Sequence, residues 1–129
     1  MKKNGVLNTP ISQLLSELRH TDQIVIGDCG LPVPSGVKEI DISLTLGKPG
    51  FIEVLDIIIE HMEIEEAILA EEIVDRNPAT HTEVVKRLNN IQYAPHEELK
   101  KVSANAKAII RSGENTPYAN VILQAGVIF

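Results

Sequence analysis

The sequence predicts a single three-layer α/β/α domain with a mixed, mostly parallel sheet of about six strands. Short apolar or alternating segments, typical of strands, take turns along the chain with segments of helical apolar spacing. The 129 residues suit one domain, and a hydrophobic content of 43% is enough to build a core. No linker, repeat or low-complexity segment divides the chain, so residues 1–129 are expected to fold as one unit.

The N-terminal part is expected to form a helix followed by a buried strand. Pro10 suits the first position of a helix, and Thr9 can cap it. Apolar side chains then recur at i, i+3, i+4 and i+7, namely Ile11, Leu14, Leu15 and Leu18. The helix is expected to end near residues 19–20. A buried strand at 24–27 and a rigid loop at 31–36, with two prolines and a glycine, follow.

The rest of the chain continues the alternation. Residues 39–44 alternate between polar and apolar side chains, as in a strand with one solvent-exposed face. A helix is expected at 51–61 and a strand at 67–73. The next helix is expected from Pro78, with Asn77 as its cap, to about residue 88. A short strand at 91–93 and a helix from 95 to about 105 are expected to follow. Residues 107–111 and 119–124 are expected to pair as a final hairpin, which makes the sheet mixed. A longer helix reaching residue 111 also fits.

Composition excludes several functional classes. The net charge of −6, without a basic stripe and with 3% aromatic residues, argues against binding nucleic acid. No run approaches the ~20 apolar residues that span a membrane. The lone Cys29 excludes an intramolecular disulfide and a multi-cysteine zinc site. The first ten residues are basic but lack the apolar core of a signal peptide, so a cytoplasmic protein is expected.

The segment around the first strand holds the strongest functional candidates. Asp28 follows the strand and stands between Gly27 and Gly30, at the place where open α/β sheets bind ligands. His20 precedes the strand, and imidazole groups can give or take a proton near neutral pH. Structural alternatives remain: His20 can interact with a helix dipole, and Asp28 can bond its own turn. Cys29 is expected to be structural, since nothing marks it as an activated thiolate. A small polar substrate suits this segment.

Two further segments carry polar groups suited to a hydroxyl-rich ligand. His96 and Lys100 are four residues apart and share one face of a helix start. Tyr118 and Asn120 alternate before the last strand, so they point the same way if extended, and they supply hydrogen-bond donors and acceptors. For the first segment, the alternative is a helix N-terminus whose acidic residues complement its dipole, with a Glu97–Lys101 surface pair. For the second segment, the alternative is a plain turn.

Other features carry no site. His61 and His81 are expected to be surface or structural residues. The glutamates between residues 60 and 72 lack regular ligand spacing and are expected on a solvated face: Glu60, Glu63, Glu65, Glu66, Glu71 and Glu72. Motifs for nucleotides, dinucleotides and serine hydrolases have no match. The apolar tail at 125–129 suggests burial in a core or a subunit interface.

Taken together, these motifs resemble the family of the ribose pyranases and fucose mutarotases. The resemblance lies in His20 and in the segments 1–8, 27–34, 41–51, 95–100 and 111–127 (among them GDCGLPVP, PHEELK and RSGENTPYANVILQAGV), and it spans the whole chain. Leu99 departs from it, since an aromatic residue is expected there; the difference affects packing rather than chemistry.

The resemblance implies an isomerase that interconverts the pyranose and furanose forms of D-ribose without a cofactor and feeds ribose use in the cytoplasm. It implies a catalytic role for His20. It implies sugar binding by Asp28, His96, Tyr118, Ala119 and Asn120, with Lys100 as a further contact. It also implies a homodecamer of two stacked five-membered rings, with sites between neighbouring subunits.

Spacing supports a shared site independently. His20 and Asp28 are eight positions apart in a mostly extended segment, or roughly 25 Å at ~3.3 Å per residue. If both residues contact one sugar, we expect them to come from different subunits. Two alternatives stay open at this point: a mutarotase for fucose or another sugar, and a non-catalytic sugar-binding subunit linked to ribose uptake.

Overall fold

Six strands form one sheet in the order β2-β5-β1-β6-β3-β4 in the computed structural model, which describes residues 1–129. The strands are β1 (Gln23–Gly27), β2 (Lys38–Asp41), β3 (Ile64–Ala70), β4 (Ile91–Ala94), β5 (Ala108–Arg111) and β6 (Val121–Ala125). Strand β6 runs antiparallel to its neighbours β1 and β3, whereas all other pairs are parallel. The prediction of a mixed, mostly parallel sheet is therefore confirmed.

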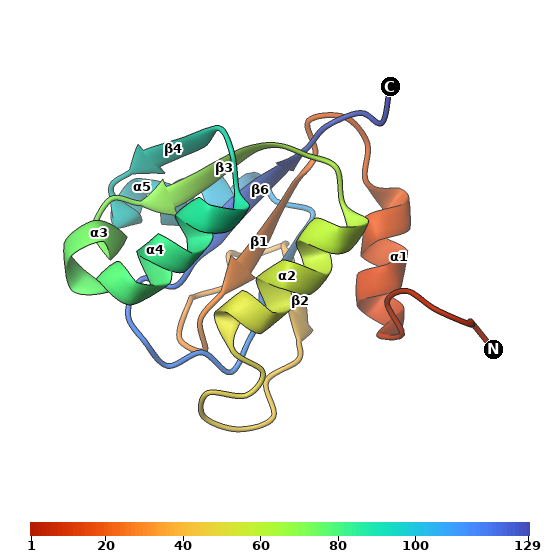
Figure 1. Cartoon of the computed structure of the whole chain (residues 1–129), viewed down its shortest axis with the longest axis horizontal. Coiled ribbons are helices and arrows are strands. Elements are labelled where there is room, and N and C mark those ends of the chain that lie inside the picture. The colour runs from red at the N-terminus through yellow and green to blue at the C-terminus, as the bar shows by residue number, and fades with distance from the viewer.

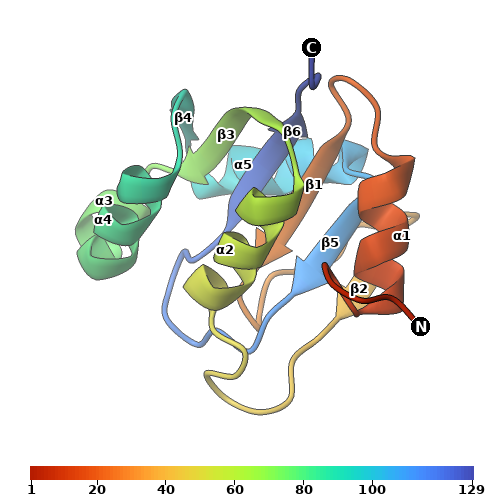
Figure 2. The same ribbon diagram turned by 45° about the vertical axis from the view of Figure 1, so that its right-hand side comes forward.

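Helices cover both faces of this sheet, as Figures 1 and 2 show. They are α1 (Thr9–Glu17), α2 (Phe51–His61), α3 (Ile73–Arg76), α4 (Pro78–Arg87) and α5 (His96–Val102), with a 3-10 turn at Ser103–Asn105. Helices α1, α2 and α4 lie on one face, and α5 lies on the other, which confirms the three-layer architecture. None of the helices has both the length and the apolar character that a membrane crossing requires.

Strict alternation along the central strands divides the core into two layers. In β1, Ile24 and Ile26 belong to the larger cluster under α1, α2 and α4, whereas Val25 belongs to the smaller cluster with Leu99 of α5. The three β1 residues are fully buried. Successive side chains of a strand point to opposite faces, so a strand that is apolar at every position belongs in the middle of a covered sheet.

The predicted C-terminal hairpin is wrong. Strands β5 and β6 flank β1 on opposite sides and do not pair with each other. Because β1 is buried on both faces, its backbone groups must find partners on both edges, and β5 and β6 supply them.

Several predicted boundaries shift for local reasons. Asn8, not Thr9, caps α1, with its Oδ1 accepting a hydrogen bond from the Ile11 amide at 3.1 Å. The third strand ends at Ala70, and residues 73–76 form the short helix α3 instead of extending it. The alternative of a helix running to residue 111 is wrong, because the chain leaves the 3-10 turn at Asn105 and enters β5.

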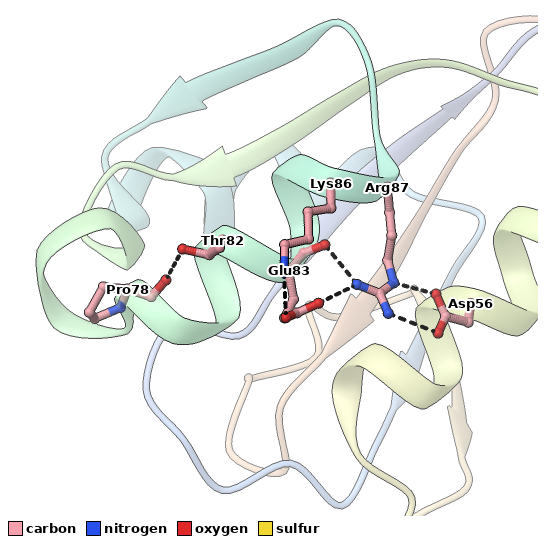
Figure 3. Close-up of polar contacts among 6 residues, drawn as sticks. All are labelled: Asp56, Pro78, Thr82, Glu83, Lys86 and Arg87. Atoms are coloured by element: carbon pink, nitrogen blue, oxygen red, sulfur yellow. Dashed lines mark hydrogen bonds and ion pairs between the residues drawn. The ribbon is translucent and has the colours of Figure 1, made fainter.

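Helices α2 and α4 are joined by one arginine on their solvent side. Arg87 donates to Asp56 Oδ2 of α2 at 3.3 Å and to Glu83 Oε2 of its own helix at 2.7 Å (Figure 3). Lys86 adds a contact with Glu83 at 3.1 Å. These hydrogen bonds lower the pKa of Glu83, with the Arg87 bond as the largest cause. The ion pair between Arg87 and Asp56 links α4 to α2 on the same face of the sheet.

Candidate functional site

The carboxyl edge of the sheet gathers most of the predicted site residues. Strands β1, β3 and β4 run in one direction and β6 in the other, so the ends of β1 and β4 lie at the same edge as the start of β6. Asp28 directly follows β1, His96 follows β4, and Tyr118 and Asn120 precede β6. The structure thus places four separate predicted residues at the edge where α/β sheets bind ligands.

Asp28 and Asn120 hold each other in a reciprocal pair of hydrogen bonds. The Asp28 amide donates to Asn120 Oδ1 at 2.8 Å, and Asn120 Nδ2 donates to Asp28 Oδ2 at 2.9 Å. Asn120 is fully buried. The other carboxylate oxygen, Asp28 Oδ1, accepts from the Gly30 amide at 2.9 Å. The alternative that Asp28 bonds its own turn is therefore confirmed. The hydrogen bonds from Gly30 and Asn120 together fix the orientation of the Asp28 carboxylate.

His96 and Tyr118 form the second part of this edge. Their rings meet edge to face, with centroids 5.1 Å apart and planes at 82°. His96 Nδ1 is buried and has no hydrogen-bond partner. A buried ring nitrogen without a partner is costly and unusual. The His96 amide donates to both carboxylate oxygens of Glu72, at 3.0 and 3.1 Å, which fixes the start of α5.

Two predicted residues have other contacts. Ala119 is fully buried and belongs to the larger core cluster, so only its backbone is available to a ligand. Lys100 pairs through Nζ with Glu97 Oε1 at 2.7 Å on its own helix. The alternative of a surface ion pair at this helix start is therefore right in kind, but the partner of Glu97 is Lys100 and not Lys101, whose Nζ lies 4.0 Å from Glu98 Oε2.

Beside Asp28 lies a hollow of about 270 Å³ formed by two loops. It is lined by Asp28, Cys29, Gly30, Glu114, Asn115, Thr116 and Pro117. Arg111 holds the lining residue Cys29 in place, since Arg111 Nε donates to the Cys29 carbonyl at 2.9 Å. Arg111 Nη1 donates to Asp41 Oδ2 at 3.0 Å. The pKa of Asp41 lies below its usual value, first because Ser43 donates to its carboxylate and also because of Arg111.

His20 lies at the opposite edge of the sheet, in the turn between α1 and β1. This turn is held against the end of β6 by the Thr21 amide, which donates to the Ala125 carbonyl at 2.9 Å. His20 Nε2 lies 3.3 and 3.2 Å from the two carboxylate oxygens of Glu65 at the start of β3. A hollow of about 330 Å³, lined by His20 and by apolar residues of α1 and of the C-terminal tail, adjoins it.

Within one chain, His20 is therefore not brought together with the other candidates. The five residues of β1 separate the two edges, a span of about 16 Å at ~3.3 Å per residue. No group of three or more His, Cys, Asp or Glu side chains is placed to hold a metal ion.

Comparison with protein families gives a match over residues 1–128 to the RbsD / FucU transport protein family. The chain belongs to this family. Among curated RbsD / FucU relatives, a D-ribose pyranase from Staphylococcus haemolyticus is 56% identical over 129 residues, which is 100% of each chain. A D-ribose pyranase from Bacillus cytotoxicus is 55% identical over 131 residues, again with full coverage of both.

Solved structures of RbsD / FucU proteins share the fold. The structure of Bacillus subtilis RbsD complexed with D-ribose matches with a TM-score of 0.98 and 47% identity, covering 100% of both chains. The fucose mutarotase of Streptococcus pneumoniae, solved with L-fucose, matches with a TM-score of 0.80 and 24% identity, covering 99% of this chain and 100% of its own. At that identity, the second match speaks for the fold alone.

Sequence reasoning misses the residues that hold these candidates in place. Glu65 and Glu72 are expected on a solvated face, yet they contact His20 and the His96 backbone. Arg111 and Glu114 support the loop at Asp28, and the Cys29 amide donates to the Glu114 carbonyl at 2.8 Å. No local sequence pattern marks these residues, because their partners are far away in the chain.

Proposed function

We propose that this chain is a D-ribose pyranase, which interconverts the pyranose and furanose forms of D-ribose without a cofactor. The observation that carries the proposal is the 56% identity over the full length of a D-ribose pyranase. The TM-score of 0.98 to an RbsD structure complexed with D-ribose adds to it. Fucose mutarotase and FucU structures match at only 24% and 25% identity, which favours ribose over fucose.

The reaction needs acid/base groups and fixed hydrogen bonds. To open the pyranose ring, a base removes the proton of the anomeric hydroxyl, the bond between C1 and the ring oxygen breaks, and that oxygen gains a proton. The C4 hydroxyl then attacks the C1 aldehyde, loses its proton, and the former carbonyl oxygen is protonated, which gives the furanose. A positioned acid/base side chain contributes typically ~10²–10⁴-fold, and we assign this role to His20.

The carboxyl edge of the sheet would bind the sugar. Asp28 and Asn120 are held rigidly by their mutual hydrogen bonds and can orient sugar hydroxyls. The partnerless Nδ1 of His96, beside Tyr118, suits a hydroxyl donor. The Ala119 backbone and Lys100 complete the proposed binding residues, Lys100 after release from Glu97.

The two edges would meet between subunits. His20 and Asp28 lie at opposite ends of β1, so we propose that one sugar contacts His20 of one chain and Asp28 of a neighbour. A homodecamer of two stacked five-membered rings would supply such neighbours. Exposed apolar side chains support an assembly: Leu7 (74%), Leu44 (87%), Leu46 (74%), Ile128 (90%) and Phe129 (100%). We place this assembly in the cytoplasm, which cell fractionation tests.

Proton NMR of D-ribose tests the activity directly. One pyranose anomeric signal is inverted, and the furanose signals are followed with and without protein. We expect the protein to speed magnetisation transfer between ring forms and the His20→Ala variant to lose this acceleration, by about 10²–10⁴-fold. His81→Ala, which removes an imidazole that contacts Tyr93 on the surface, is the matched control and should retain it.

Other outcomes would overturn the proposal. No acceleration with ribose together with line broadening of L-fucose would identify a fucose mutarotase. Tight ribose binding without turnover would identify a sugar-binding subunit. Full activity of His20→Ala would remove His20 from its role.

A further inference from the structure

Glu65 lies against His20 at a place where the backbone of β3 departs from regular pairing. We propose that Glu65 is a positioning residue that holds the His20 imidazole with its proton on Nε2, so that Nδ1 is the atom that takes the proton of the sugar. The inference rests on the proposed pyranase function and adds to it a second residue and a defined reacting atom.

The contact itself determines the tautomer. His20 Nε2 lies 3.3 Å from Glu65 Oε1 and 3.2 Å from Oε2, and an ionised carboxylate can only accept hydrogen bonds. Nε2 must therefore carry a proton, which leaves the lone pair of neutral imidazole on Nδ1. The side chains of His20 and Glu65 are 50% and 46% exposed, so the His20 ring is open to a sugar held by a neighbouring subunit.

The carboxylate of Glu65 is kept ionised by its surroundings. Gln124 Nε2 donates to Glu65 Oε2 at 3.1 Å. This hydrogen bond is the largest cause of a pKa of Glu65 below its usual value, and the His20 contact is the next. Gln124 in turn accepts from Gln23 of β1 at 3.5 Å, so the carboxylate is tied to the strand that follows His20.

The backbone aims Glu65 at His20. Ile64 pairs with Ala125 and Glu66 pairs with Gln124, so Glu65 is the extra residue of a β-bulge. Bulges redirect a side chain and occur often beside active sites. Asn90 Nδ2 donates to the Glu65 carbonyl at 2.8 Å and holds the bulge.

A glycine makes room for this bulge. A Cβ at Gly126 would lie 3.3 Å from Glu65 Cβ, which is closer than side chains usually pack, and 3.5 Å from the Glu65 amide nitrogen, which is an ordinary contact. The missing side chain at Gly126 therefore lets the tail that follows β6 pack closely against Glu65.

No other carboxylate contacts His20. On its own turn, Arg19 donates through its amide to Asp22 Oδ2 at 2.8 Å, and Lys107 just before β5 also faces Asp22, at 3.8 Å. His61 and Glu63 line the adjacent hollow, and Glu63 makes no side-chain hydrogen bond. Glu65 is thus the group that stabilises the imidazolium when Nδ1 has taken the hydroxyl proton, before that proton passes to the ring oxygen. A carboxylate also orients the imidazole base of serine hydrolases, but there it accepts from Nδ1 and Nε2 is the base, so the two ring nitrogens exchange roles.

The test compares two charge-removing variants on the same strand. Glu65→Gln keeps the size of the side chain but can donate to Nε2 and so favour the other tautomer. We expect its kcat for ribose to fall at least about tenfold, with KM changed less than about twofold, since the sugar-binding edge is untouched. Glu66→Gln removes the same charge from the next residue, whose side chain makes no hydrogen bond or ion pair, and should match the wild type. Glu65→Asp, which keeps the charge but shortens the reach, should fall between them.

A spectroscopic measurement on the unmodified chain completes the test. With ¹⁵N-labelled histidine, the neutral His20 ring of the wild-type protein should show the pattern of a protonated Nε2, and Glu65→Gln should lose it. A protonated Nδ1 in the wild type, or an unchanged kcat in Glu65→Gln, would overturn the inference. If the wild type itself lacks activity or His20→Ala keeps it, the proposed function fails instead, so the two failures are distinguishable.

Discussion

At the scale of single residues, the carboxyl edge depends on one buried amide. Asn120 uses Oδ1 and Nδ2 to bind the amide and the carboxylate of Asp28, and Asn120 is fully buried. An amide group suits this place because it donates and accepts at once. Isosteric Asp would accept only and would repel the Asp28 carboxylate.

Replacing Asn120 should therefore affect stability and binding together. Asn120→Ala leaves the Asp28 amide without a partner, and we expect the free energy of unfolding to fall by about 1–3 kcal/mol, with a raised KM for ribose. Urea unfolding and the NMR exchange assay measure the two effects. Asn115→Ala, in the exposed part of the same loop, is the control and should change unfolding by less than about 0.5 kcal/mol. Equal effects of the two variants would contradict the assigned role.

At the scale of elements, two loops at this edge interlock. The Gly47 amide donates to the Gly113 carbonyl at 2.6 Å, and the Gly113 amide donates to the Pro49 carbonyl at 2.8 Å. Glu114 Oε1 accepts from the Phe51 amide at 3.0 Å and so serves the first turn of α2, whose own cap residue Gly50 has no side chain to do it. The loop before β6 thereby positions both a helix and the hollow at Asp28.

Adding a methyl group at Gly113 should disrupt the contact between these two loops. A Cβ at Gly113 would clash with the carbonyl oxygen of Lys48, which belongs to the backbone and cannot turn away. We expect Gly113→Ala to lower the free energy of unfolding by about 1–3 kcal/mol, by analogy with overpacked cores. A Cβ at Gly30 would have Asp28 Oδ1 as its nearest neighbour, at 3.6 Å, which is an ordinary contact, so Gly30→Ala is the matched control. Thermal unfolding of both variants decides the comparison; a Gly113→Ala protein as stable as the control would refute the steric argument.

At the scale of the whole molecule, the proposed acid/base group and the proposed sugar-binding groups lie at opposite edges of one sheet. The turn that carries His20 stands beside the C-terminal tail, and the loop after β1 lies at the other end (Figure 1). The apolar tail is exposed in the single chain, with Phe129 fully accessible to solvent. The proposed site between chains would account for both features.

Mixing two inactive chains tests the shared site. His20→Ala and Asp28→Ala should each be inactive, and co-assembled chains should regain activity, because some sites combine an intact His20 with an intact Asp28. Random mixing in equal amounts gives about one quarter of the wild-type sites. Sedimentation velocity verifies the mixed assemblies and their subunit number. Verified mixed assemblies without activity would mean that each site uses residues of a single chain.

The sequence by itself determined the α/β/α class, most helices and the candidates around β1, because apolar periodicity, caps and strand-end polar residues are local signals. Only the tertiary structure decided that β1 separates β5 from β6, and that Glu65 faces His20 while Asn120 faces Asp28. These are pairings between residues 45 and 92 positions apart, with no local pattern to announce them. Strand order and side-chain partners depend on which elements pack against one another, and this packing involves residues that are far apart in the sequence.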